Sequence, residues 1–244
     1  MTSRHVTSRN VTAAPPILVV TGLAREARLA GGPGIAVIGG DRARLRSALA
    51  EAPSCRAVIS FGIAGGLDPT LRPGAVVVAR GVTGGGAWPS HPGILRVWIE
   101  RLERSGERLT DAIIAGVDAP LVAPTEKAAL RAATGAAAAD MESHLAAAFA
   151  ATRRLPFAAL RIVCDPAERG LPPLAAEALR PDGTLDVAAI LRSLAARPAQ
   201  LAALPRLARD AGAAFAALGR VRAALGPGFG LGGLSLDEPL GDVP

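Results

Sequence analysis

Four short runs of apolar, mostly β-branched residues, bounded by turn residues, constrain the fold of this chain most strongly. They are ILVVT (17–21), IAVIG (35–39), AVISF (57–61) and AVVVA (75–79). Such runs are typical of strands buried on both faces of a sheet. Between the second and third lies DRARLRSALAE (41–51), with Leu45 and Leu49 at helical spacing and Asp41 in the N-cap position. Strand, helix and strand in this order predict an α/β sheet with parallel pairs.

The alternation continues along the chain. We expect helices over 91–106 and 124–133, and strands over 112–117 and 157–165. Beyond Leu171 prolines interrupt the helical pieces, and 207–225 is expected to be a helix packed on the sheet, with a helix lying on a membrane surface as the alternative. One domain over 16–225 is therefore predicted, with a disordered tail over 1–15 and a loose Gly/Pro-rich tail over 226–244.

The net charge and the two cysteines limit the partners, metal sites and cellular compartment that we expect. The net charge of +6 comes from arginines spread along the chain, without a basic block among aromatic residues, which argues against a nucleic-acid partner. Cys55 and Cys164 form no CxxC pair, so we expect no metal site and a reducing, cytoplasmic compartment. No apolar stretch approaches the roughly 18 residues that a membrane span needs.

Carboxyl groups stand at the ends of two predicted strands. Glu26 lies just past the first strand, and Asp165 ends the last one, four residues after Arg161. Ligands commonly bind at this edge of a parallel sheet, and a partly desolvated Asp has a raised pKa that suits a proton donor. The alternatives are an exposed first-turn glutamate at position 26 and an Asp-Pro turn at position 165.

The run AAAADMESHLAAAFA (136–150) places Asp140, Glu142 and His144 among apolar residues. Charged groups are rarely buried without partners, so this run is either a helix with a solvated face or the polar edge of a buried site. In the second case 136–142 ends a buried strand and a helix starts near Ser143. The roles of Asp140 and His144 stay open between support of a site and plain structure.

Three glycines, Gly62, Gly65 and Gly66, follow the third strand. Glycines there let backbone N–H groups approach a phosphate or a ribose, although a tight structural turn accounts for them equally well. They form neither a GxGxxG motif that opens a helix nor a Walker loop.

In order along the chain, Glu26, the block GIAGGLDPTLRPGAVVV (62–78), DMES (140–143) and the strand ending at Asp165 resemble the purine nucleoside phosphorylase and methylthioadenosine nucleosidase superfamily. Within it, DMESHLAA, LRIVCDPAERGLPP and LRPDGTLD are most similar to hopanoid-associated phosphorylases. The resemblance implies a nucleoside phosphorylase-like fold, with a central mixed sheet flanked by helices. It also implies a homo-oligomer that releases adenine from adenosylhopane in hopanoid biosynthesis.

The resemblance also implies roles for single residues. Asp165 would be the acid at purine N7, and Glu26 the base that positions and deprotonates water. The substrate-binding residues would be Glu142 and Met141 at the ribose, Gly65 and Gly66 on a loop beside the nucleoside, and the Leu121 backbone at the adenine edge. Pro120 and Leu121 replace the phenylalanine that often stacks on the base, and Cys164 replaces a small hydroxyl residue, so base stacking and support of Asp165 are expected to be weaker.

Hydrolysis and phosphorolysis both remain open. Arg25, Gly39, Gly40 and Arg42 could form a phosphate cradle, with inorganic phosphate as co-substrate, whereas Glu26 would repel a phosphate dianion and suits water as nucleophile. No cofactor is expected.

The alternatives in function are a nucleosidase for soluble substrates such as methylthioadenosine, S-adenosylhomocysteine or futalosine, and a non-catalytic nucleoside- or lipid-binding protein. A lipid-tailed substrate also leads us to expect peripheral contact with the inner face of the membrane, through the C-terminal helix and the loop at Trp88.

Overall fold

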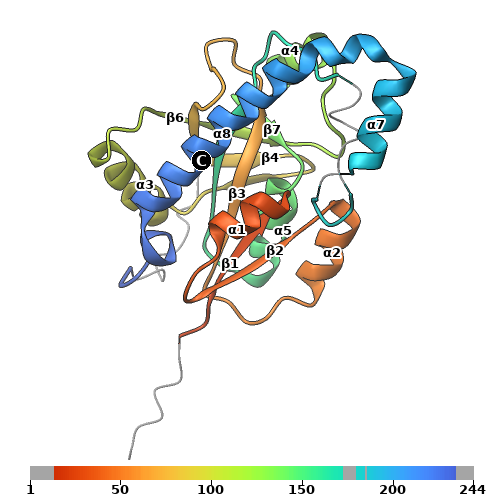
Figure 1. Ribbon diagram of the computed structural model, residues 1–244. Helices are drawn as coiled ribbons and strands as arrows, with labels where there is room; N and C mark the ends of the chain where they lie inside the picture. The colour runs from red at the N-terminus through yellow and green to blue at the C-terminus, as the bar shows by residue number, and fades with distance from the viewer. Residues whose placement is uncertain (1–13, 173–179, 185, 235–244) are drawn as a thin grey trace, which may run out of the picture.

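The computed structural model describes residues 14–172, 180–184 and 186–234, so most of the expected N-terminal tail and residues 235–244 lie outside it (Figure 1). The strands are β1 (Ile17–Thr21), β2 (Ile35–Gly39), β3 (Ala57–Gly66), β4 (Val76–Thr83), β5 (Ala87–Pro89), β6 (Leu109–Gly116), β7 (Ala138–Asp140) and β8 (Phe157–Asp165). The α-helices are α1 (Ala24–Ala30), α2 (Arg42–Ala50), α3 (Pro92–Arg104), α4 (Pro124–Thr134), α5 (Ser143–Arg153), α7 (Val187–Ala196) and α8 (Leu204–Leu225). Two 3₁₀ helices, η1 (Pro198–Ala203) and η2 (Pro227–Gly230), flank α8.

The strands form one mixed sheet that closes on itself in part. Strand β1 pairs in parallel with β2 and β3, as predicted from the strand–helix–strand order. Strand β8 pairs in parallel with β3 and antiparallel with β4, while β7 and β6 connect β3 to β4 on the other side. Strands β3, β7, β6, β4 and β8 therefore form a closed ring, and β1 and β2 extend the sheet from β3. The expected α/β fold with a mixed central sheet flanked by helices is confirmed.

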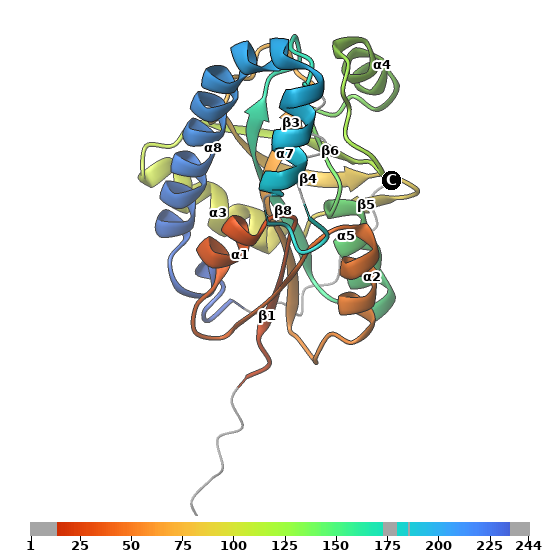
Figure 2. The ribbon, with the colours of Figure 1, turned by 45° about the vertical axis from the view of Figure 1, so that its right-hand side comes forward.

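Side chains alternate across β1 and divide the core into two clusters. Ile17 and Val19 belong to a cluster with side chains of α3 and α8, and Leu18 and Val20 to a second cluster with side chains of α2 and α5. Figure 2 shows α1, α3 and α8 on one side of the sheet and α2 and α5 on the other. The alternation thus fixes which helix layer each strand residue contacts.

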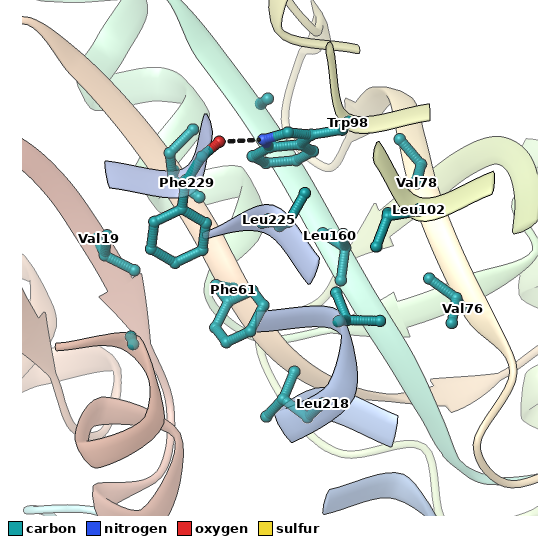
Figure 3. Close-up of a cluster of buried hydrophobic side chains, with 14 of the residues drawn as sticks. Val19, Phe61, Val76, Val78, Trp98, Leu102, Leu160, Leu218, Leu225 and Phe229 are labelled. Atoms are coloured by element: carbon teal, nitrogen blue, oxygen red, sulfur yellow. Dashed lines mark hydrogen bonds between the residues drawn. The ribbon is translucent and has the colours of Figure 1, made fainter. Parts of the chain in front are cut away.

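The first cluster contains much of the chain's sparse aromatic content (Figure 3). The rings of Phe61 and Phe229 meet edge to face with centroids 5.1 Å apart, and the Trp98 indole N–H donates to the Phe229 carbonyl at 3.0 Å. Phe229 and Leu231 are fully buried, so the core extends past the expected domain boundary at Leu225 into the segment expected to be a loose tail.

Most elements match the expected ones, including β1, β2, β8 and the helix start at Ser143. Two details differ. Strand β2 is only half-buried because it is an edge of the sheet. Strand β3 continues to Gly66, since Gly65 and Gly66 pair with Ala139 and Ala138 of β7, so these glycines lie in a strand and not in a loop.

The C-terminal half of α8 packs on the sheet, as expected, and buries Phe215, Leu218, Val221 and Leu225. None of the helices in the described ranges combines the length and the apolar character that a membrane crossing requires.

Candidate functional site

A cavity of about 460 Å³ lies where the ends of β1, β3 and β8 meet the segment between β7 and α5. Small-molecule sites usually have volumes of about 300–1,000 Å³, so a nucleoside-sized ligand is compatible with it. Of the eleven residues that the sequence assigned to the site, seven line it: Glu26, Gly40, Gly65, Leu121, Met141, Glu142 and Asp165. Four others, Arg25, Gly39, Arg42 and Gly66, do not line it.

Glu26 is held in the cavity wall by backbone donors. Its side chain points from the first turn of α1 with the residue only 2% exposed, so the alternative of an exposed helix-start glutamate is wrong. One carboxylate oxygen accepts from the N–H groups of Gly22 at 2.9 Å and Leu23 at 2.8 Å, and the other from that of Ile63 at 2.7 Å. Burial raises the pKa of Glu26, against the Arg161 charge and these hydrogen bonds.

Asp140 and Glu142 share a buried cation, Arg161 of β8. The guanidinium forms an ion pair with Asp140, donates to Ser60 Oγ at 2.7 Å, and lies 3.6 Å from Glu142 Oε2. The N–H and hydroxyl of Ser143, the first residue of α5, also donate to Asp140. Asp140 therefore anchors the start of α5 and orients Arg161 toward Glu142.

The environment of Glu142 favours its protonated form. Burial, with the charges of Asp140 and Glu26, raises its pKa to about 8, although Arg161 opposes the rise. Near neutral pH a protonated Glu142 can both donate and accept a hydrogen bond, which suits a pair of sugar hydroxyls. Its neighbour Met141 also lines the cavity.

Asp165 forms a buried ion pair with the only lysine of the chain. Lys127 Nζ lies 2.5 Å from Asp165 Oδ2, and the lysine is 1% exposed. Burial raises the pKa of Asp165, and the Lys127 charge offsets part of that rise. Burial also raises the pKa of the adjacent Cys164 thiol to about 12, so the thiol stays protonated at neutral pH.

His144 of α5 does not line the cavity. Its side chain lies against Gly116, at the end of β6. Its Nε2 is 3.4 Å from Asp118 Oδ1, its Nδ1 is buried without a hydrogen-bond partner in the described structure, and burial lowers its pKa. A β-carbon on Gly116 would lie 2.3 Å from the His144 β-carbon. His144 thus fills the space that Gly116 leaves, and packing accounts for its position.

The arginines expected to form a phosphate cradle are engaged elsewhere. Arg25 stacks over the Phe215 ring at 4.1 Å and joins α1 to α8. Arg42 pairs with Asp118 at 2.8 Å. Gly39 leaves no room for a β-carbon because Thr21 Oγ1 would be 2.6 Å from it, which gives this glycine a structural role. Of the expected set, Gly40 alone reaches the cavity.

The sequence did not predict three features of the site. They are Lys127 as the partner of Asp165, Arg161 with Ser60 as the support of Glu142, and the segment 180–184 as a wall of the cavity. Two signals were available: a lone lysine in an arginine-rich chain, and an arginine inside an apolar strand. Within the described ranges, no three His, Cys, Asp or Glu residues are placed to hold a metal ion.

Comparison with known proteins agrees with the fold. The family model of the phosphorylase superfamily matches residues 2–203. No curated protein sequence was found to match the chain. Among solved structures, Campylobacter jejuni 5′-methylthioadenosine/S-adenosylhomocysteine nucleosidase is 15% identical with a TM-score of 0.56, over 74% of this chain and 96% of its own.

Two Helicobacter pylori structures are similar as well. Futalosine hydrolase is 14% identical with a TM-score of 0.56, over 62% of this chain and 88% of its own. The second is a mutant of the 5′-methylthioadenosine/S-adenosylhomocysteine nucleosidase with 5′-methylthioadenosine in its active site. It is 12% identical with a TM-score of 0.60, over 87% of this chain and 96% of its own. At these identities the likeness shows the fold alone.

Proposed function

Since the chain belongs to the phosphorylase superfamily, we propose that it is an enzyme that hydrolyses the N-glycosidic bond of a purine nucleoside. The observation that carries the proposal is that Glu26, Glu142 and Asp165, which stand far apart in the sequence, line one cavity. Breaking an N-glycosidic bond builds positive charge on the sugar and negative charge on the base. An acid at the base and the Glu26 carboxylate near the sugar stabilise these opposite charges, while Glu142 hydrogen-bonds to the sugar hydroxyls.

Glu26 suits the role of general base. Its three backbone donors occupy three of the roughly four lone-pair positions of a carboxylate, which leaves one for a water molecule. Its raised pKa makes it a stronger base than an exposed glutamate. In the proposed step, water attacks C1′ and gives its proton to Glu26. Asp165 gives its proton to N7 as the C1′–N9 electron pair moves to the purine.

The charges around the cavity favour water over phosphate as the nucleophile. Five carboxyl groups line it, those of Glu26, Asp41, Asp140, Glu142 and Asp165. The cations in the lining are Lys127 and Arg180. Lys127 donates to Asp165 and to two backbone carbonyls, so all three of its protons are used. Arg180 lies 3.9 Å from Asp186, so neither cation of the lining is free of a carboxylate partner. A phosphate dianion would therefore meet the Glu26 carboxylate without an unpaired cation in the described lining.

For the substrate, we propose adenosylhopane, with adenine as the product. The resemblance of 140–147, 160–173 and 179–186 to hopanoid-associated phosphorylases supports this choice. Six apolar residues in the lining are also suited to contact an apolar substituent: Leu23, Leu67, Val117, Pro120, Leu121 and Leu171. A soluble nucleoside such as methylthioadenosine is the second candidate, because the solved structures of similar fold include nucleosidases named for it.

The test is adenine release by the purified protein in phosphate-free buffer. Adenosylhopane in detergent, methylthioadenosine and futalosine are compared as substrates, with adenine or hypoxanthine measured by chromatography. Release without phosphate is expected, and strict dependence on added phosphate would overturn the hydrolytic mechanism. The variant Asp165→Asn should bind nucleoside without turning it over. Turnover equal to that of the unmodified protein would overturn the assignment of the acid.

A further inference from the structure

The one buried residue of α4 is a lysine. In a helix that covers a protein surface the inward position is normally apolar, yet Lys127 is the only residue of α4 that is buried. Removing an ammonium group from water is costly unless the charge is paired and its protons are hydrogen-bonded. The fold meets this requirement at Lys127, because all three protons have acceptors.

The acceptors of Lys127 all belong to the end of β8 and the turn that follows it. They are Asp165 Oδ2 at 2.5 Å, the Pro166 carbonyl at 2.9 Å and the Arg169 carbonyl at 2.9 Å. The same turn is tied to the start of α4 by the Leu171 N–H, which donates to the Val122 carbonyl at 2.9 Å. The ammonium group therefore joins α4 to the turn and fixes Asp165 within it.

We propose that Lys127 is a positioning residue for the reaction: it holds the Asp165 carboxyl group in the cavity and directs its proton to Oδ1. The reaction uses the protonated form of Asp165, whereas the ion pair is its ionised form. In the protonated form the ammonium group still donates to Oδ2 and disfavours a proton on that oxygen, so the acidic proton resides on Oδ1. When Asp165 transfers this proton to the base, the resulting carboxylate forms beside the Lys127 cation. The cation thus stabilises the charge that develops on Asp165 in the transition state. This role rests on the proposed function, whereas the ion pair itself can be tested without turnover.

A single lysine makes a direct test of the ion pair possible. Protein labelled with ¹⁵N-lysine has one side-chain ammonium signal, from Lys127. We expect this signal to exchange slowly with solvent, and to shift in the variant Asp165→Asn and on addition of adenine. The proposal would be overturned by an ammonium signal that exchanges with solvent as fast as that of a free lysine, or by one that does not shift in Asp165→Asn, even if the protein is an active nucleosidase.

The pH profile tests the effect on the acid. In Lys127→Gln the loss of the cation should raise the pKa of Asp165 further, so the basic limb of kcat/KM should move to higher pH while kcat falls. Lys127→Arg keeps the charge and should keep the limb near its original pH. The matched control is Arg131→Gln, which removes a cation one turn along α4 that pairs with Asp68 at 2.7 Å.

The control should leave the basic limb unchanged. A basic limb in Lys127→Gln that does not move, in protein with unchanged thermal stability, would show that Lys127 has only a structural role. If neither the unmodified protein nor any variant released a base, the proposed function would fail, and the ¹⁵N measurement would still decide the ion pair.

Discussion

The Glu26 carboxylate lies directly against the backbone of Gly62, and a β-carbon at position 62 would be 2.5 Å from its Oε1. Real β-carbons essentially never come so close to another heavy atom. Gly62 does not have a positive φ, so the glycine is required by space and not by backbone conformation. The glycine of β3 and the carboxylate of α1 thus form one structural unit, although 36 positions separate them in the chain.

The first prediction follows from this contact. Gly62→Ala should displace the Glu26 carboxylate, lower kcat by roughly 100-fold and reduce the free energy of unfolding by about 1–3 kcal/mol. Urea denaturation and initial rates of adenine release measure the two effects. The matched control is Gly212→Ala in α8, where a β-carbon would have no neighbour within 4 Å. It should stabilise the protein slightly, and equal behaviour of the two variants would contradict the argument.

The second prediction concerns the three backbone donors of Glu26. In Glu26→Gln the side-chain NH₂ group must face at least one backbone N–H, because both carboxylate oxygens accept from such groups. We expect kcat to fall by about 10²–10⁴-fold, as for loss of a general base, and stability to fall by about 1–3 kcal/mol. Glu126→Gln is the control, since Glu126 accepts from Val122 and Ala123 N–H groups at an exposed position. Nearly unchanged kcat in Glu26→Gln would exclude Glu26 as the base.

The third prediction concerns pH and stability. The folded-state pKa of Glu142, about 8, lies above its ordinary value of 4.5. Between these values the folded protein keeps a proton that the unfolded chain releases, so the stability contributed by this group is complete below pH 4.5 and is lost as the pH rises toward 8. The melting temperature should therefore fall between pH 5 and 8, and fall less steeply in Glu142→Gln. The pKa values of Glu26 and Asp165 are also raised, so part of the fall should remain in Glu142→Gln. Equal slopes of melting temperature against pH in the unmodified protein and in Glu142→Gln would contradict the assignment to Glu142.

The fourth prediction concerns the buried pair of Asp140 and Arg161, whose side chains are 1% and 0% exposed. Asp140→Ala removes the nearer carboxylate partner of the buried Arg161 and leaves only Glu142, 3.6 Å away, so it should lower the free energy of unfolding by about 3–5 kcal/mol. Glu100→Ala is the control, because Glu100 and Arg104 pair on the exposed face of α3. That change should cost less than about 1 kcal/mol, and similar losses in both variants would show that Asp140 is not an anchor.

The sequence was most informative where the pattern of apolar residues alone determines the bounds of a helix or strand. Strand β8 begins and ends at the predicted residues, because its apolar run is bounded by Pro156 and Pro166. The end of β3 was missed, since Gly65 and Gly66 are typical turn residues and are held in a strand by their pairing with β7 and, at Gly65, also with β8. Long-range pairing of this kind leaves no local pattern.

The candidate site was predictable in its carboxyl groups and not in their partners. Glu26, Glu142 and Asp165 could be singled out from their places at strand ends and from the resemblance to a family. The environment of these carboxyl groups could not be predicted, because the cations that surround them lie on other elements. Lys127 reaches Asp165 from α4, and Arg161 meets Glu142 only because β8 lies in the sheet beside β3. Burial and charge at the site are therefore properties of the tertiary structure.

The closed ring of strands also determines when the site can exist during folding. Val58 of β3 pairs with Phe157 of β8, so the ring closes only when segments almost a hundred residues apart in the chain meet. Contacts of such long range form slowly, because loop closure must precede them. Asp165 is at the end of the closing strand, and Arg161, the cation next to Glu142, is within it. A chain that has formed only β1, β2 and their helices thus contains Glu26 without Ile63, Arg161 and Asp165 beside it, and the cavity wall is complete only when β8 has joined β3 and β4.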